Sequence, residues 1–311
     1  MKRKMEIEKE IAGNIGSPDE VDLVLENGGD GIGLYRTEFL YMDRNELPTE
    51  QEQFEAYGSV LEKMNGKPVV IRTLDIGGDK NVDYLDFPDE MNPFLGYRAI
   101  RYCLENESLF KEQLRALVRA SAYGNLKIMF PMISGMDELI RAKELLAEAK
   151  REAMEKDAEL QPTYEVGLMI ETPAAAMMAD QLAKQVDFFS IGTNDLIQYT
   201  VAVDRMNEHI AQLYDPFHPA VLRLIKRTIE QGAKAGIWVG MCGELAGDPK
   251  LIPVFVGMGL DEFSMSAGSI LEARSLISKS SMEELAPKVD ELLALGSGKE
   301  VKQYIEENLM K

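Results

Sequence analysis

Residues 188–195, FFSIGTND, contain the pattern that decides the fold. The first half of this stretch, residues 188–191, is short, mostly apolar and β-prone, and the second half, residues 192–195, is polar. A helical stretch follows, and the same order of short strand, polar cluster and helix recurs along the chain. Strands that alternate with helices predict a parallel sheet covered by helices.

This recurrence predicts eight strands in a chain of 311 residues. Eight strand–helix units of this total length suit a closed (β/α)8 TIM barrel, and the alternative is a doubly wound open sheet. No low-complexity segment or long linker divides the chain, so we expect residues 1–311 to form one domain. The predicted strands are 7–14, 31–35, 69–73, 127–132, 167–170, 188–191, 238–241 and 262–264.

Capping signals and apolar spacing predict the helices between these strands. Ser17, followed by Pro18 and then Glu20, indicates an N-cap with a capping box, and this helix should end near Glu26. Helical spacing of apolar residues predicts three more helices, around residues 110–118, 139–149 and 221–229, the last one ending at Gly236.

The composition limits the kinds of partner. A formal net charge of −19 disfavours nucleic acids and anionic lipid surfaces, whereas an anionic substrate needs only a few arginines gathered in one place. Two cysteines make no disulfide framework and suit a reducing cytosol, so we expect a cytoplasmic protein. The first residues lack the apolar run of a signal peptide, and the longest apolar run, residues 251–260, is about half of a membrane span.

Polar side chains gather at the predicted carboxyl ends of the strands. In a barrel these ends share one rim, where the chemistry of such folds takes place. The loops of the opposite rim, around Asn125 and Asp187, lack comparable groups, and this asymmetry favours the barrel. The residues that follow the strands in order are Arg36, Thr37 and Glu38; Arg72, Asp75 and Lys80; Glu171 and Thr172; Thr193, Asn194, Asp195 and, further on, Arg205; Cys242 and Glu244; and Ser264 and Ser266.

Five of these residues predict a site for an anion and a metal ion. Arg36, Arg72 and Arg205 have planar guanidinium groups, which bind phosphate or carboxylate oxygens in pairs. Glu171 and Asp195 end neighbouring strands, and two carboxylates together with substrate oxygens are the usual ligands of Mg²⁺. We therefore expect Mg²⁺ as the cofactor, held by these two acids.

Asn194 and Cys242 complete the expected site. Asn194 supplies a neutral donor beside the metal ligand, and Cys242 is a candidate acid, because a thiol is mostly protonated at neutral pH. A phosphate, a carboxylate, a bridging metal ion and a carbon that gains a proton describe a small phosphorylated enol acid. Phosphoenolpyruvate, which leaves pyruvate when it loses its phosphate, fits each of these elements.

Each of these residues also has a simpler interpretation when it is taken alone. An arginine at a strand end is more often part of a surface ion pair, and Glu171 on its own suits a structural carboxylate. Cys242 on its own suits a small buried apolar residue, which is the interpretation we keep for Cys103 in its helical pattern. His209 and His218 show no paired ligand spacing and are expected to be structural or substrate-loop residues. The gathering of the rim residues favours the functional interpretation.

The sequence closely resembles the C-terminal, phosphoenolpyruvate-binding domain of enzyme I of the bacterial sugar phosphotransferase system. The resemblance runs from about residue 11 to residue 266 and rests on long strings rather than short motifs. The matching stretches are 30–44 (DGIGLYRTEFLYMDR), 70–80 (VIRTLDIGGDK), 92–101 (NPFLGYRAIR), 128–133 (IMFPMI), 171–176 (ETPAAA), 187–205 (DFFSIGTNDLIQYTVAVDR), 240–248 (GMCGELAGD) and 257–266 (GMGLDEFSMS).

The resemblance implies a (β/α)8 barrel that dimerises and a role for each site residue. Related dikinases and synthases share the GTNDL and CGE motifs, but the TEFLYMDR string is more similar to enzyme I. The implied roles are contacts of Arg36, Arg72, Arg205, Asn194 and Asp195 with phosphoenolpyruvate, Mg²⁺ ligation by Glu171 and Asp195, proton donation by Cys242, and contributions of Lys80 and Arg98 to the phosphate site.

In the enzyme I family an N-terminal half precedes this barrel and carries the phosphoacceptor histidine and the carrier-docking helices. Neither of the two histidines of this chain lies in a matching context. We therefore expect a donor-binding domain that needs a separate N-terminal half to complete transfer. Two other functions stay open from the residues, a binding and dimerisation module and a metal-dependent lyase or aldolase that acts on pyruvate-like acids. The third arginine and Cys242 argue against the lyase.

Overall fold

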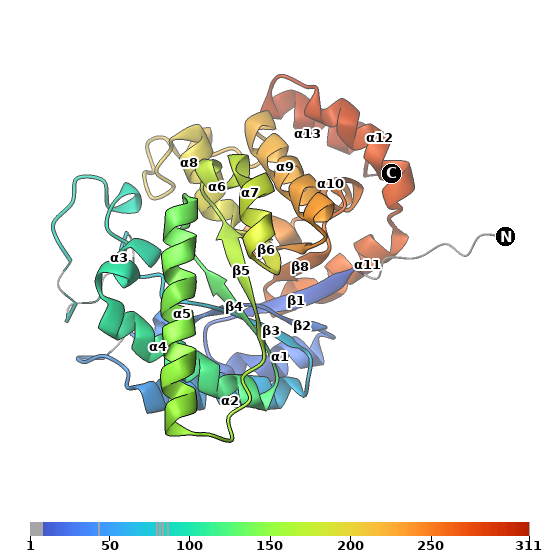
Figure 1. Cartoon of the computed structure of the whole chain (residues 1–311). Helices are drawn as coiled ribbons and strands as arrows, with labels where there is room; N and C mark the ends of the chain where they lie inside the picture. The colour runs from blue at the N-terminus through green and yellow to red at the C-terminus, as the bar shows by residue number, and fades with distance from the viewer. Residues whose placement is uncertain are drawn as a thin grey trace.

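Eight parallel strands form a closed barrel in the computed structural model, which describes residues 9–42, 44–78, 80, 82, 84–85 and 87–310 (Figure 1). Each strand pairs with the next, and the last one pairs with the first. The predicted (β/α)8 barrel is thus confirmed, and the open sheet is excluded. The strands are β1 (Glu10–Ile15), β2 (Gly31–Arg36), β3 (Pro68–Arg72), β4 (Asn125–Phe130), β5 (Tyr164–Ile170), β6 (Phe188–Ile191), β7 (Trp238–Met241) and β8 (Glu262–Met265).

Helices follow the strands and surround the barrel, as Figure 1 shows. Two further helices, α12 and α13, lie beyond the last strand–helix unit. The helices are α1 (Val21–Glu26), α2 (Glu50–Met64), α3 (Ile100–Glu105), α4 (Glu107–Ala120), α5 (Met136–Lys156), α6 (Pro173–Met177), α7 (Ala179–Leu182), α8 (Thr193–Val201), α9 (Pro219–Ala235), α10 (Ile252–Met258), α11 (Ile270–Lys279), α12 (Met282–Leu293) and α13 (Gly298–Asn308).

The predicted strand bounds agree closely with those observed. β6 and β7 are as predicted, and the other strands differ by a few residues at their ends. The prediction for β1 began at Ile7, and both Ile7 and Glu8 lie outside the described residues. The helices predicted around residues 110–118, 139–149 and 221–229 are α4, α5 and α9. Gly236 ends α9 with a left-handed φ of 77°, which a glycine adopts without steric cost.

The predicted capping box at the first helix is wrong. The chain enters α1 through a short 3₁₀ turn at Pro18–Glu20, and the Ser17 side chain makes no capping hydrogen bond. The Glu20 carboxylate instead accepts a hydrogen bond of 3.1 Å from the Gly16 backbone N–H. A 3₁₀ turn is wound more tightly than an α-helix, so the backbone N–H groups are not placed where the Ser17 hydroxyl would meet them.

The hydrophobic core has two parts. The larger part fills the space between the barrel and the helices. The smaller part lies inside the barrel and consists of Leu34, Val70, Met129, Met169, Phe188 and Cys242, with Trp238 packed against it. Among the described residues, no helix has the length and apolar character to span a membrane.

Candidate active site

The carboxyl ends of the strands surround a cavity of about 950 Å³. Side chains from β1, β2, β3, β5 and β8 and from the loops that follow the strands, including the one after β7, line this cavity. The structure therefore brings together predicted site residues that are up to 206 positions apart in the sequence, from Arg36 to Cys242. Eight predicted site residues line the cavity: Arg36, Arg72, Lys80, Glu171, Asn194, Asp195, Arg205 and Cys242.

A network of buried ion pairs forms one wall of the cavity. Arg72 lies 2.8 Å from Glu38 and 2.7 Å from Asp75, and Lys80 contacts the same two acids at 2.8 and 3.3 Å. Burial raises the pKa of Glu38, but the charges of Arg72 and Lys80 outweigh burial and leave that pKa below its usual value. The pKa of Asp75 lies well below its usual value, because its neighbouring cations likewise outweigh the effect of burial. Both acids therefore keep their negative charge.

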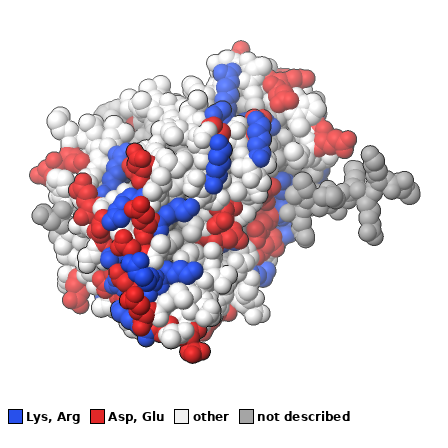
Figure 2. Space-filling model, viewed as in Figure 1, with Lys and Arg blue, Asp and Glu red and all other residues white. Residues whose placement is uncertain are grey.

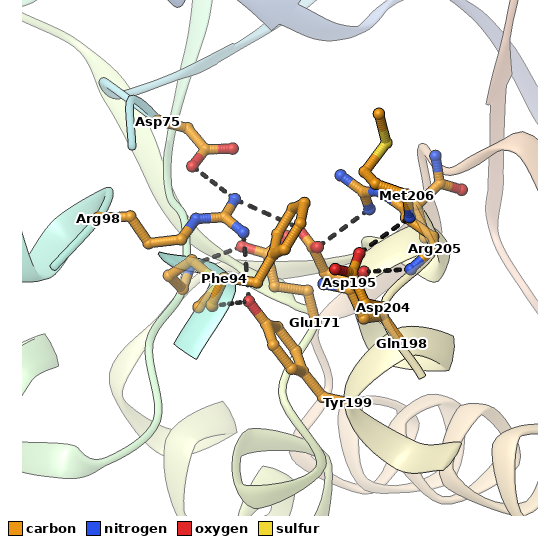
Figure 3. Close-up of polar contacts among 12 residues, drawn as sticks. Asp75, Phe94, Arg98, Glu171, Asp195, Gln198, Tyr199, Asp204, Arg205 and Met206 are labelled. Atoms are coloured by element: carbon orange, nitrogen blue, oxygen red, sulfur yellow. Dashed lines mark hydrogen bonds and ion pairs between the residues drawn. The ribbon is translucent and has the colours of Figure 1, made fainter. Parts of the chain in front are cut away.

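Arg98 lies behind this wall and does not line the cavity. Only 1% of its surface is exposed, and its guanidinium lies between Asp75 at 2.9 Å and Asp195 at 3.3 Å (Figure 3). It also donates to the Tyr199 hydroxyl at 3.2 Å, and that hydroxyl donates to the Phe94 carbonyl. Arg98 thus joins the wall to Asp195 and holds that carboxylate in position.

Arg205 and Asn194 approach the cavity from the helix and loop that follow β6. Arg205 contacts the other oxygen of Asp195 at 3.0 Å, so that two arginines hold this carboxylate from two sides (Figure 3). Asn194 exchanges two hydrogen bonds with Glu244, one from its amide to the carboxylate at 3.3 Å and one from the Glu244 backbone N–H at 3.4 Å. These contacts link the ends of β6 and β7.

Several polar atoms beside the cavity are buried and have no hydrogen-bond partner among the described residues. They include Nε of Arg36, Nε of Arg72 and Oε2 of Glu38. The Arg36 guanidinium lies over the Phe39 ring, 4.9 Å from its centre, and has no ion pair in the described part of the chain. Arg36 is therefore a cation that the fold leaves available to an anionic ligand.

Glu171 is a buried acid at the end of β5. Its Oε1 accepts a hydrogen bond of 2.6 Å from the backbone N–H of Met132, a residue with an unusual left-handed φ of 56°. Burial, together with the charges of Asp195 and Asp75 and against those of Arg72 and Arg98, raises the pKa of Glu171 to about 8. A cation bound between Glu171 and Asp195 would oppose both effects, so these acids fit a metal ion.

The donor set limits which metal ion fits. No group of three or more His, Cys, Asp or Glu side chains among the described residues is arranged to hold a metal. Two carboxylates that face an open cavity leave most coordination positions to water or substrate, which is how proteins usually bind Mg²⁺. The residues present thus agree with the predicted pair of ligands.

Cys242 lies directly after β7 with 4% of its surface exposed to the cavity. Asn14 donates a hydrogen bond of 2.9 Å to the Cys242 carbonyl and fixes the backbone there. A side chain on the next residue, Gly243, would collide with Thr193, whose hydroxyl lies 1.8 Å from the ideal Cβ position. Burial raises the pKa of the Cys242 thiol to about 12. The sulfur is therefore held as a protonated thiol beside the cavity.

Residues outside the predicted site also contribute to it. The sequence places Glu38 and Asp75 at the strand ends without indicating a role, and in the structure they hold Arg72 and Lys80 in place. Tyr199, which supports Arg98, is not predicted, because it lies on α8 without a local motif. The strands that start at the opposite rim carry charged residues of their own, namely Glu10 of β1 and Lys127 of β4, which pairs with Glu165 of β5. These residues lie on strands, so the prediction that the loops of that rim are plain stays a prediction.

The two remaining predictions about cysteine and histidine agree with the structure. Cys103 is fully buried in α3 and contacts only the Leu74 carbonyl through its sulfur, as a core residue does. His218 caps α9 by accepting a hydrogen bond of 3.2 Å from the Ala220 backbone N–H. Outside the cavity, Figure 2 shows basic and acidic side chains interspersed over one face. Ion pairs such as Lys111–Glu152 and Arg141–Glu107 join α4 to α5. This face is no basic patch of the kind that binds nucleic acid.

Comparisons with known proteins show the family of this chain. The sequence family described as "PEP-utilising enzyme, PEP-binding domain" matches residues 2–282. A phosphoenolpyruvate-protein phosphotransferase from Geobacillus stearothermophilus is 61% identical over 96% of this chain, and one from Bacillus subtilis (strain 168) is 59% identical over 96%. The chain spans about half the length of these curated relatives, 52% in each case.

Solved structures support the fold alone. A citrate lyase from Burkholderia xenovorans LB400 has a TM-score of 0.54 and 16% identity, with 98% of this chain and 92% of that chain covered. An aldolase/citrate lyase family protein from Burkholderia cenocepacia J2315 has a TM-score of 0.52 at the same identity, with 88% and 93% covered. The barrel, the gathered rim residues and the sequence matches agree, and the chain belongs to the PEP-binding domain family of PEP-utilising enzymes.

Proposed function

We propose that this chain is the donor-binding half of a phosphoenolpyruvate-protein phosphotransferase, the enzyme I of a sugar phosphotransferase system. The observation that carries the proposal is the cavity in which three arginines, two neighbouring acids and one protonated thiol meet. The names of the relatives that are about 60% identical support the same activity. A lyase needs fewer cations at its mouth, and no described contact favours it.

Arg36, Arg72 and Arg205 bind the phosphate and carboxylate oxygens of phosphoenolpyruvate, with Lys80, Asn194 and Asp195 beside them. Arg98 contributes to this site from behind the wall, where it is buried and holds Asp195 in position. Fixed cations stabilise the charge that develops on the phosphoryl group as its bond to the enol oxygen breaks. Mg²⁺, held by Glu171 and Asp195, would add a further positive charge at the same oxygens.

Cys242 completes the reaction on the carbon side. The phosphoryl group leaves for a histidine, and the remaining enolate of pyruvate takes the proton of the Cys242 thiol at its methylene carbon. The carbon–hydrogen bond forms as the sulfur–hydrogen bond breaks, and the sulfur is left as a thiolate. A thiol that stays protonated at neutral pH suits this step, because it holds its proton until the enolate appears.

The phosphoacceptor histidine is proposed to lie on an N-terminal half, since the curated relatives are about twice as long as this chain. Given radiolabelled phosphoenolpyruvate, this chain alone should stay unlabelled and should become a donor only when such a half is supplied. Stable labelling of His209 or His218 would contradict the proposal. A single-domain barrel, a homodimer and a cytoplasmic location stay predictions.

Calorimetric titration with phosphoenolpyruvate, with and without Mg²⁺, tests the binding site. Glu171→Gln should weaken the Mg²⁺-dependent binding by about tenfold or more, because it removes one of two charged ligands. Glu20→Gln is the matched control, since Glu20 lines the same cavity on the side of β1 and, among the described residues, its carboxylate accepts a hydrogen bond from the Gly16 backbone alone. Equal affinity of wild type and Glu171→Gln at every Mg²⁺ concentration would show that the metal site is assigned wrongly.

A further inference from the structure

The interior of the barrel below the cavity contains a buried acid. TIM barrels are usually filled with branched apolar side chains. Here Glu262 of β8 lies inside the barrel with 3% of its surface exposed. The charged groups that face it are Glu10 of β1 and Lys127 of β4, and Lys127 is already paired with Glu165 of β5. Glu262 has no ion pair in the described part of the chain.

Two glycines make room for the Glu262 carboxyl. An ideal Cβ on Gly33 of β2 would lie 2.2 Å from Oε1, and one on Gly240 of β7 would lie 2.0 Å from Oε2. Gly240 pairs in register with Glu262 on one side and with Ser190 of β6 on the other. Ser190, Gly240 and Glu262 therefore form one level of the barrel, and Oε2 extends over the bare Gly240 backbone toward β6.

This level lies directly below Cys242, which is two residues after Gly240 on the same side of β7. The Ser190 hydroxyl lies close enough to the Cys242 thiol to lower its pKa, although not in regular hydrogen-bond geometry. Oγ of Ser190 and Oε2 of Glu262 are both buried and have no hydrogen-bond partner among the described residues. Two unsatisfied polar atoms thus lie on either side of one glycine, beneath the thiol.

An unpaired acid in such a place holds a proton at neutral pH. Burial, with a contribution from Glu10 and opposed by Lys127, raises the pKa of Glu262 to about 8. The Cys242 thiol above it must regain a proton after each turnover, because it becomes a thiolate each time it protonates an enolate. While product fills the cavity, the sulfur has little access to water, since only 4% of Cys242 is exposed even without it.

We propose that Glu262 stores the proton that reloads Cys242 after each turnover and delivers it through the Ser190 hydroxyl. The inference rests on the proposed role of Cys242 as proton donor. The Glu262 carboxyl gives its proton to Ser190 Oγ, directly or through one water molecule, as Ser190 gives its own proton to the Cys242 thiolate. The Glu262 carboxylate then regains a proton from water. Glu262 acts only through Cys242 and does not touch the substrate.

Ketonisation of enolpyruvate by this chain tests the relay. Enolpyruvate is generated in the assay from phosphoenolpyruvate by an added phosphatase, and its conversion to pyruvate is followed by rapid mixing in the presence of Mg²⁺. Glu262→Gln keeps the size of the side chain but cannot store a proton. It should protonate one equivalent of enolpyruvate per chain at the wild-type rate, because the thiol starts out loaded. Later turnovers should be about 10²-fold slower.

The pH profile gives a second readout that a purely structural role of Glu262 would not change. The steady rate of the wild type should fall as pH rises through about 8, where Glu262 loses its proton. Glu262→Gln should lack this fall, and Glu10→Gln should move it to lower pH, since Glu10 raises the pKa of Glu262. Ser190→Ala, which removes one buried oxygen atom, should show the same single-equivalent burst as Glu262→Gln.

Each outcome decides a different point. Wild-type steady rates and an unchanged pH profile in both Glu262→Gln and Ser190→Ala would overturn the relay and would mean that water reloads Cys242 from the cavity. If Cys242→Ala removes catalysis while the other two variants are normal, the relay alone is wrong. If Cys242→Ala ketonises enolpyruvate as fast as wild type, the proposed role of Cys242 fails and the relay fails with it.

Discussion

The two ends of the barrel differ in whether their buried acids are paired with cations. At the mouth, the acids Glu38, Asp75 and Asp195 each contact at least one cation within 3.0 Å. At the lower interior, Glu262 has neither an ion pair nor a hydrogen-bond partner for Oε2 in the described part of the chain. The mouth holds these three carboxylates charged by pairing them and leaves Glu171, whose pKa is raised, without an ion pair among the described residues, whereas the lower interior keeps Glu262 neutral by leaving it unpaired.

The difference shows what each end is able to do. Ion pairs that are buried from water are fixed in place and present a constant electrostatic field to a negatively charged ligand. A neutral buried acid is able to gain or lose a proton without breaking an ion pair, so little reorganisation is needed. The mouth is therefore suited to binding and charge stabilisation, and the lower interior to proton storage.

The largest expected effect comes from removing Asp75, which pairs with Arg72, Arg98 and Lys80. Asp75→Ala leaves buried cations without their shared partner, and the loss in free energy of unfolding should be about 3–5 kcal/mol. Urea denaturation measures this loss. The matched control is Glu306→Ala, which breaks the exposed pair with Lys250 and should leave the midpoint unchanged. Equal effects of the two variants would mean that the mouth network does not stabilise the fold.

The arrangement of residues at the mouth could largely be predicted from the sequence, whereas the buried acid of the lower interior could not. Strand–polar–helix repeats predicted the barrel, and the rule that strand ends share one rim correctly placed Arg36, Glu171 and Cys242 around one cavity. Glu262 is the first residue of the short strand β8 and follows Asp261. From its residue type alone, a glutamate would be expected at a solvent-exposed position. Its burial depends on Gly33 and Gly240, which lie on other strands, so only the closed barrel reveals it.

The same limit applies to Arg98. The resemblance implied that it contributes to the phosphate site, but its ion pairs with Asp75 and Asp195 could not be foreseen from the string NPFLGYRAIR. Ion pairs between residues far apart in the sequence depend on side-chain rotamers and on how deeply each side chain is buried. Neither the periodicity nor the spacing of residues indicates these.

The second prediction concerns pH and the raised pKa of Glu262. The folded state binds the proton of this acid up to about pH 8, whereas the unfolded chain loses it near the ordinary pKa of a glutamate. Stability should therefore fall as pH rises between these values, by at most about 1.4 kcal/mol per pH unit for this group. Glu262→Gln removes this contribution, so the variant should gain stability relative to wild type as pH increases. Parallel melting-temperature profiles of the two proteins between pH 5 and 9 would contradict a buried neutral acid.

The third prediction concerns Gly240, which leaves space for the Glu262 carboxyl. Gly240→Ala places a methyl group only 2.0 Å from Oε2 of Glu262. This clash should lower the free energy of unfolding by about 1–3 kcal/mol. In a Glu262→Ala background the same change should have a smaller effect, because the colliding carboxyl is gone. A double-mutant cycle measures this coupling. Additive effects of the two substitutions would mean that Gly240 is required for a different reason.

The smallest expected effect concerns Trp238, which helps close the lower end of the barrel. Its ring stacks on Phe188 at 4.4 Å between centres, Lys127 lies 5.2 Å above it, and its Nε1–H donates to Glu165 at 3.1 Å. Trp238→Phe keeps the stack and loses the hydrogen bond, so the loss should be about 1 kcal/mol. Trp238→Leu also removes the stack and should lose about 0.5–1.5 kcal/mol more in chemical denaturation. Because Glu165 retains Lys127, neither change leaves an unpaired charge, unlike Asp75→Ala at the mouth. A loss from Trp238→Phe as large as that from Asp75→Ala would mean that the lower end also depends on tightly paired charges, and the contrast between the two ends would not hold.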